Sequence, residues 1–435
     1  MRKLLILLLL AGLLAGCQQD NDNPSGATPA IAGTPATGDA TPPTDAVAEA
    51  TAAPTGTPAP TLPPTATPRP PKDLVVCVGA EPADLYLYGD DSIAATAVRH
   101  ALYESPVTSL GYEYQALALE KLPSLADGDA LVQTVEVAEG DPVITAAGEL
   151  APLGQGTTVV DAAGQTVIYD GQPIAMSQLV VNYTFHPLIW SDGTPVTADD
   201  SVFSFEVARD RTTPRHDTQA RYTAAYEATG ERSVRWTGLP GYRDPAFMTH
   251  VWPPLPRHQL GDFAPAELPA LDEAARAPLS YGAFVVESWT AGESIRLVPN
   301  PAYYRAAEGL PHLTSLTFRF LEQRPRGLPD GYEGCHVLTS DVLAFDALTA
   351  VDAAVEEGEL VEHVASAGVI EQIIFGIDPS ATFEETHTPW FADTRVRQAV
   401  TQCIDRQALV DEFTAGRSTV MDTFVPVSYT HLRAH

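Results

Sequence analysis

A long segment almost without large apolar side chains limits where this chain can fold. Residues 18–71 consist almost entirely of Pro, Thr, Ala, Gly, Ser and Asp and have no apolar periodicity. Such a segment buries too little surface to offset the entropy lost on ordering, and its prolines favour extended conformations. We therefore expect a disordered tether over 18–71, and the fold of this 435-residue chain must be built from residue 72 onward.

The first 17 residues have the pattern of an export signal. Arg2 and Lys3 precede the apolar run Leu4–Leu10, which is too short for a membrane-spanning helix. The run ends in LAGC at 14–17, which resembles the bacterial lipobox. This resemblance implies lipidation of Cys17 and an exported protein, anchored by acyl chains to the outer face of the cell membrane or held in the periplasm. An ordinary signal peptide is the alternative.

The charge balance of the chain excludes some classes of partner. Lys and Arg number 25 and Asp and Glu number 56, so the formal net charge is −31. This excess repels polyanions, and we therefore expect neither nucleic acid nor anionic lipid surfaces as partners. Acidity also favours solubility, so it does not by itself predict a cationic ligand.

The four cysteines are Cys17, Cys77, Cys335 and Cys403. They form no CxxC pair and no spacing with histidine that is typical of a metal site, so no metal is expected. With Cys17 assigned to lipid, at most one disulfide can form among the other three. We expect Cys77, in a strand, and Cys403, in a helix, to be small buried apolar side chains.

Apolar patterns after residue 72 alternate between strand and helix periods, which indicates an α/β protein. Short β-type runs separated by GD, DG and AG turns indicate a small β-rich subdomain at about 111–180. The expected strands are 74–79, 180–188, 281–289, 294–298, 313–321 and a buried one at 369–377, and the expected helices include 93–104 and 396–413. Asp192-Gly193 predicts a tight turn, and Thr197 is the expected N-cap of the helix that follows it.

Four stretches, in order along the chain, resemble one known family. WSDGTPVTADDSVFSF at 190–205 is similar to a signature of the family 5 extracellular solute-binding proteins, the peptide- and nickel-type receptors of bacterial ABC importers. Segments 81–105, 281–304 and 391–417 are similar to its first strand-loop-helix, its hairpin ending in NPAYY and its DTRVRQA helix. Ala283 stands where the family usually has proline.

The resemblance implies a two-lobed periplasmic-binding-protein-like fold of class II, cluster C. We expect lobe I at 72–324 and an incomplete lobe II at 325–426, because the family's second lobe normally continues well past the DTRVRQA helix. Residues 427–435 do not resemble the family and are expected to be a non-native tail. This interpretation makes the chain a fragment that binds its solute weakly or not at all.

The loop between the first strand and the following helix lies along the ligand cleft in resembling proteins. In this chain the loop reads YGDDSI: its tyrosine can stack on a solute, its glycine permits close backbone approach, and its aspartates can accept hydrogen bonds from an ammonium group. The alternative is that the segment DDS only caps the helix. The candidate ligand-binding residues are Tyr88, Gly89, Asp90, Asp91, Ser92 and Ile93.

The function that the resemblance implies is a monomeric, lipid-anchored receptor that encloses a peptide or similar small solute and delivers it to an ABC permease, without cofactors. Peptides, nickel, sugars and opines stay open as solutes. The chain has no GxSxG, HExxH, GxGxxG or Walker motif, so we do not expect an enzyme. A surface-tethered hydrolase or glycan-binding module is the alternative function.

Overall fold

The computed structural model describes residues 72–110, 113–215, 217–344, 346–365, 372–375, 377 and 390–421. The expected signal at 1–17, tether at 18–71 and tail at 427–435 lie outside the described residues. The chain divides into a larger unit, which contains Pro71–Gly368 and continues from Phe413, and a smaller unit, which contains Val369–Glu412. Each unit is described by itself.

The first sheet of the larger unit has the first strand of the described chain near one edge. That strand, the apolar run DLVVCV, runs parallel to both of its neighbours, whereas the other pairs in the sheet are antiparallel. Its register pairs Asp73 with Ser315, so segments far apart in sequence lie side by side. In spatial order the strands are β12 (Phe284–Thr290), β13 (Ser294–Pro299), β14 (Ser315–Phe320), β1 (Asp73–Val78) and β15 (Val337–Leu338).

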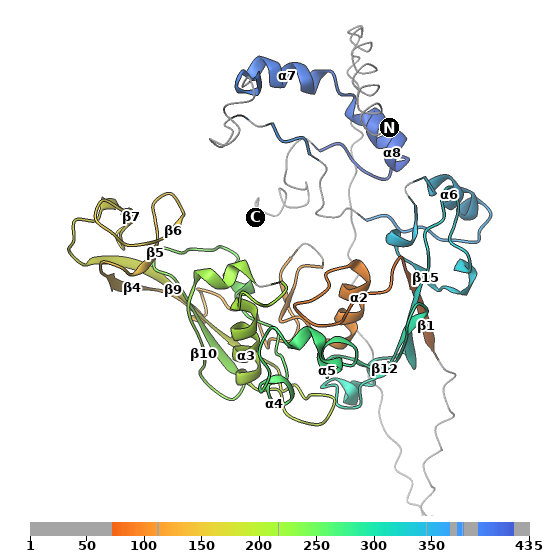
Figure 1. Ribbon diagram of the computed structural model, residues 1–435, viewed down its shortest axis with the longest axis horizontal. Coiled ribbons are helices and arrows are strands. Elements are labelled where there is room, and N and C mark those ends of the chain that lie inside the picture. Colours follow the sequence, from red (N-terminus) through yellow and green to blue (C-terminus); the bar gives the residue numbers. More distant parts are fainter. Residues whose placement is uncertain are drawn as a thin grey trace, which may run out of the picture. The chain divides into compact units, whose positions relative to one another are not determined.

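A second, antiparallel sheet and three short hairpins complete the β-structure described in the larger unit. Two of the hairpins lie beyond one end of β4 and β9 and within the range expected for the β-rich subdomain (Figure 1). The sheet contains β10 (Thr223–Ala228), β11 (Ser233–Gly238), β9 (Ile174–Thr184) and β4 (Ala130–Val137), in spatial order. The hairpins pair β2 (Val107–Thr108) with β3 (Gln115–Ala116), β5 (Pro142–Ile144) with β6 (Leu150–Pro152), and β7 (Thr158–Val160) with β8 (Thr166–Ile168).

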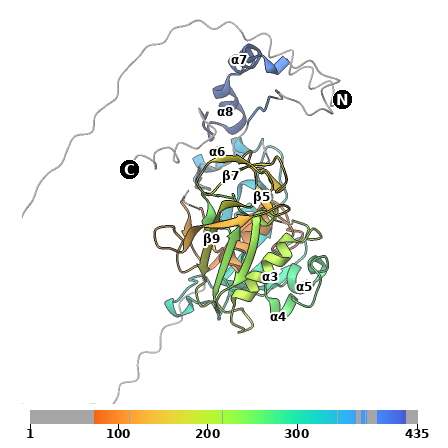
Figure 2. The same ribbon diagram turned by 90° about the vertical axis from the view of Figure 1, so that its left-hand side faces the viewer.

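Helices cover the sheets of this unit. Helix α3 (Ala198–Arg209) packs on β10 and β11, and Figure 2 shows it against the face of the antiparallel sheet. Helix α2 packs against β12. Helix α2 spans Ile93–Leu102, and further α-helices in the described part of this unit are α4 (Arg257–Leu260), α5 (Asp272–Ala275) and α6 (Leu348–Glu356). This mixture of strands and helices confirms the predicted α/β class.

Local interactions explain why α2 and α3 begin where they do. Ser92 Oγ accepts a hydrogen bond from the Ala95 amide at 3.1 Å and caps α2. Thr197 and Asp200 form a capping box at the start of α3, in which the Asp200 carboxylate accepts from the Thr197 amide at 2.8 Å. Upstream, Gly193 has φ of 92°, which closes the turn that the DG pair predicts.

The smaller unit differs from the expected buried strand at 369–377 and from the expected single helix at 396–413. Of the strand range only 372–375 and 377 are described; none of them is in a strand, and Ile373 and Ile374 are exposed, so this expectation is wrong. It contains α7 (Thr394–Gln402) and α8 (Arg406–Thr414), the second of which continues into the larger unit. Asp405 accepts a hydrogen bond from the Ala408 amide at 2.9 Å, so a new helix starts there. Cys403 follows α7 and is exposed, so the expectation that it is a buried side chain is wrong.

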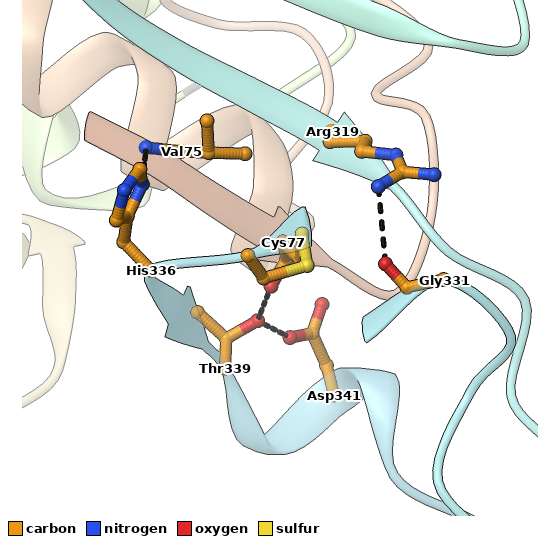
Figure 3. The surroundings of a disulfide bond; sticks show 8 residues. Val75, Cys77, Arg319, Gly331, His336, Thr339 and Asp341 are labelled. Carbon is orange, nitrogen blue, oxygen red and sulfur yellow. Dashed lines mark hydrogen bonds between the residues drawn. A yellow bond between two sulfur atoms is a disulfide. The ribbon is translucent and has the colours of Figure 1, made fainter. Parts of the chain in front are cut away.

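Cys77 is buried, as expected, but it is not a lone thiol. It forms a disulfide with Cys335, at a Cα–Cα distance of 5.8 Å and a sequence separation of 258 residues (Figure 3). The bond joins β1 to the segment before β15. Consequently residues beyond the lobe boundary expected at 325 still belong to the first sheet, because β15 pairs with Val76 and Cys77 of β1.

None of the helices in the described part of the chain combines the length and the apolar character that a membrane crossing requires.

Candidate functional site

The candidate loop is held in shape by its own Asp90 and by Asp84 in the segment before it. Asp90 Oδ2 accepts hydrogen bonds from the Ala83 amide at 2.8 Å and the Ser92 hydroxyl at 2.9 Å, and its Oδ1 accepts from the Ser92 amide at 2.8 Å. Asp84 Oδ1 accepts from the amides of Tyr86 and Asp90, at 3.0 and 3.2 Å. Both oxygens of Asp90 are therefore occupied by groups of the loop and of the segment before it.

The pKa of Asp90 reflects these contacts. Burial raises this pKa, but hydrogen bonds from Ser92 and Ala83 and the nearby Arg99 guanidinium lower it by more, so the net pKa lies below the ordinary value. Burial lowers the pKa of Arg99, against the opposing effect of Asp84 and Asp90.

Gly89 is needed for a contact within the protein. A Cβ placed on it would lie 2.0 Å from Asp84 Oδ1, so any larger residue would displace the carboxylate that orders the loop. Ser92 caps α2, and Ile93, the first residue of that helix, is 56% exposed. The capping role weighed for the segment DDS therefore applies to Ser92, while Asp90 holds Ser92 in place.

The Tyr88 side chain belongs to the same site, and its hydroxyl is hydrogen-bonded to α3. The hydroxyl lies 2.7 Å from Ser204 Oγ on α3 and 3.3 Å from the Ser204 carbonyl oxygen. Burial raises the pKa of Tyr88. The side chain is thus fixed against α3, and its hydroxyl is already engaged within the protein.

Asp91 is the loop carboxylate that faces solvent. Its side chain is 72% exposed and forms an ion pair with Arg215, whose side chain is 49% exposed. The Arg215 amide also donates to the Tyr88 carbonyl oxygen at 3.2 Å, which brings the segment after α3 beside the loop. An exposed pair of this kind contributes little to stability, so both groups can exchange partners at small cost.

These residues surround a cavity of about 440 Å³. It lies between the loop, the first turns of α2 and the segment after α3. Tyr88, Asp90 and Asp91 are the predicted residues that line it, while Gly89, Ser92 and Ile93 are not in its lining. The full lining is Leu87, Tyr88, Asp90, Asp91, Thr96, Arg99, Arg215 and Asp217.

The sequence interpretation did not identify Arg99, Arg215 and Asp217, which also line this cavity. Arg99 donates to the Tyr86 carbonyl oxygen at 3.3 Å and to Thr96 Oγ1 at 3.4 Å. Asp217 accepts from the Trp252 indole N–H at 3.0 Å and from the Gln219 amide at 2.7 Å. Helical spacing places Arg99 on α2 one turn from Thr96, but no local signal places Arg215 or Asp217 beside the loop.

The cavity combines an aromatic face, carboxylates and guanidinium groups, which suits a polar solute that carries charges of both signs. The side chains of Asp91 and Arg215 form an ion pair with each other. The side chains of Asp90, Arg99 and Asp217 form hydrogen bonds with other groups of the protein. Among the described residues, no group of three or more His, Cys, Asp or Glu side chains is arranged to hold a metal ion.

Comparison with known proteins gives a consistent picture. The model of "Bacterial extracellular solute-binding proteins, family 5 Middle" matches residues 187–433. The chain is 26% identical over 254 residues to a Brucella melitensis protein named as a binding protein, which covers 54% of this chain and 38% of that protein. It is 25% identical over 242 residues to the oligopeptide-binding protein AppA of Bacillus subtilis, which covers 54% of this chain and 40% of AppA.

A solved structure is also similar. The oligopeptide-binding protein of Thermus thermophilus in complex with a pentapeptide aligns with a TM-score of 0.49 and 18% identity, over 82% of this chain and 59% of that chain. The chain spans about two fifths of the length of the two curated relatives named above.

Proposed function

Because the chain belongs to the family 5 bacterial extracellular solute-binding proteins, we propose that it acts as the receptor of an ABC importer that captures peptides or similar small solutes. The single observation that carries this proposal is the family match over residues 187–433. Family membership and the mixed sheets and helices confirm the predicted periplasmic-binding-protein-like α/β fold of class II. Delivery to a permease and the identity of the solute are part of the proposal.

The proposed binding mechanism is closure of two lobes around the solute. Lobe I contains the first sheet and the cavity, and we place lobe II in the residues that follow the β15 strand, later than the boundary expected at 325. A solute that contacts both lobes binds the closed state better than the open one, so it shifts the population toward closure. A closed receptor is the form that a permease can distinguish from the empty one.

Within lobe I, we propose that the cavity beside the loop is the solute-binding face. Asp91 offers an exposed carboxylate to an ammonium group, and Arg215 offers a guanidinium to a carboxylate. The Tyr88 ring packs against the solute. Gly89, Asp90 and Ser92 act indirectly by fixing the loop and α2, and Ile93 lies beside them at the surface.

We also propose that the protein is exported and anchored through Cys17. The Cys77–Cys335 disulfide supports export, because such bonds persist mainly in oxidising compartments. The tether at 18–71 then separates the receptor from the membrane, and the receptor acts as a monomer.

Native mass spectrometry of the full-length receptor, purified after export in a bacterial host, tests the function. The expected result is a co-purified peptide or small zwitterionic solute. Isothermal titration with that solute then compares Asp91→Asn with Asp199→Asn, an exposed aspartate on α3 outside the cavity. We expect at least a tenfold loss of affinity for Asp91→Asn and none for Asp199→Asn. Equal affinities in both variants would exclude this cavity as the binding face.

A further inference from the structure

The segment that carries β15 is attached to the sheet by very few strand pairs. β15 pairs with β1 over Val76↔Val337 and Cys77↔Leu338, whereas β14 pairs with β1 over six positions. We call residues 331–343 the strap. Since the strap forms the outer edge of the sheet, it needs other contacts to stay in place.

The strap is also fixed to Val75 and Cys77 of β1 by hydrogen bonds from residues that flank β15 (Figure 3). The His336 amide donates to the Val75 carbonyl oxygen at 2.9 Å, and the Val75 amide donates to His336 Nδ1 at 3.0 Å. Thr339 donates to the Cys77 carbonyl oxygen through its amide at 3.1 Å and its hydroxyl at 2.9 Å. The His336 imidazole thus accepts the hydrogen bond from the Val75 amide that a backbone carbonyl oxygen would accept in a regular strand pair.

At its far end the strap contacts the beginning of the segment that connects β1 to the candidate loop. The Gly79 amide donates to Asp341 Oδ2 at 3.0 Å. A Cβ on Gly79 would lie 2.1 Å from the Asp341 carbonyl oxygen, so the two backbones are in direct contact. Gly79 directly follows β1 and begins the segment that leads to Tyr88, so the strap supports the base of that segment.

The only covalent link between the strap and β1 in the described chain is the Cys77–Cys335 disulfide. Cys77 is fully buried, and Cys335 is partly exposed. Of the two cysteines, Cys335 is therefore the one that a reducing thiolate approaches more easily. Attack by a dithiol breaks the S–S bond, leaves two cysteine thiols and converts the dithiol into its own disulfide.

We propose that this disulfide is a redox latch. Its oxidised form holds the strap against β1, and its reduction releases the strap while the rest of the sheet stays folded. The reason is that the remaining hydrogen bonds of the strap lie at the sheet edge, whereas β14 and β13 are paired on both sides. The latch closes when a thiol–disulfide oxidant accepts two electrons from the cysteine pair, which links completion of this edge to an oxidising compartment.

Hydrogen–deuterium exchange with mass spectrometry on the full chain tests the latch, with and without dithiothreitol. We expect peptides that cover 336–342 to exchange at least tenfold faster after reduction, and peptides that cover β13 to be unchanged. The Cys77→Ala/Cys335→Ala variant should match the reduced protein, and Cys403→Ser, which leaves the disulfide intact, should match the oxidised one. Free-thiol labelling confirms the state of each sample.

Asp341→Ala separates the covalent link from the hydrogen bonds. It removes the Gly79 partner and leaves both cysteines in place, so the His336 region should stay protected when oxidised and lose protection when reduced. Equal exchange of 336–342 in both redox states would overturn the proposal. So would a loss of protection throughout the larger unit on reduction, because the proposal is a local release. Neither readout uses a solute, so this result is independent of the proposed transport function.

Discussion

His250 is a buried histidine whose surroundings favour the neutral form. It is 1% exposed, its Nε2 lies 3.0 Å from Asp244 Oδ2, and its ring stacks on Trp236 at 4.4 Å between centroids. Its Nδ1 has no hydrogen-bond partner in the described part of the chain. Burial lowers the pKa of His250, and the neighbouring Asp244 carboxylate offsets only part of this effect.

This shift predicts a loss of stability on acidification. The unfolded chain has the ordinary imidazole pKa of about 6.5 and takes up the proton first as pH falls, so the free energy of unfolding decreases below that pH. The slope that one such group contributes is at most about 1.4 kcal/mol per pH unit. Below the lowered folded pKa, both states are protonated and the contribution of His250 becomes constant.

Urea unfolding between pH 7 and pH 5 measures this slope. His250→Phe keeps an aromatic ring against Trp236 but does not titrate, so its stability should depend less on pH than that of the unmodified protein. His100→Phe, at an exposed position of α2, is the matched control and should retain the full pH dependence. The same slope in all three proteins would show that His250 does not cause it.

At the scale of elements, the start of α3 depends on one buried carboxylate. Asp200 is 4% exposed and accepts hydrogen bonds from the Thr197 amide at 2.8 Å, the Arg257 amide at 2.9 Å and the Trp190 indole at 3.3 Å. It therefore joins α3 to the beginning of α4 and to the turn before α3.

We expect Asp200→Ala to lower the free energy of unfolding by about 2–3 kcal/mol, because it leaves several buried donors without an acceptor. Asp199→Ala removes an adjacent but exposed carboxylate and should cost less than about 1 kcal/mol. Denaturant titration of both variants measures the difference. Equal losses would mean that the helix dipole, and not the buried network, accounts for the effect.

Elements with local signals were predictable from the sequence. The turn at Asp192-Gly193 and the cap at Thr197 depend on contacts within a few residues, and both are found as expected. The break between α7 and α8 was missed because the apolar stripe continues through it, while Asp405, which starts the second helix, is an ordinary polar residue in that pattern.

The candidate site and the disulfide were only partly predictable, for a related reason. Tyr88, Asp90 and Asp91 lie on one continuous segment that the family resemblance identifies. Arg215 reaches the cavity through a backbone contact with Tyr88 that only the fold creates. Similarly, the number of cysteines allowed one pair, but choosing Cys335 requires knowledge that β15 lies next to β1.

At the scale of the whole molecule, β1 is separated from its partners by most of the larger unit. The hydrogen bond between Ser315 and Asp73 spans 242 residues. The strands of the antiparallel sheet are closer in sequence, as in the β9–β11 pair of Thr184 with Ser233. Contacts of long sequence separation form slowly, because a large loop must close before they are made.

These separations set an order of assembly. We expect amides of β9 and β11 to become protected before those of β1 when the protein refolds, and pulsed hydrogen exchange during refolding measures that order. Simultaneous protection of both sheets would contradict it.

A chain that emerges from a ribosome or a translocation channel with its N-terminus first presents β1 early and β14 some 242 residues later. For that interval the strand has two unpaired edges, the state in which a β-strand is most prone to pair with another molecule. The time needed to deliver residues 315–338 thus sets how long β1 stays without its partner strands.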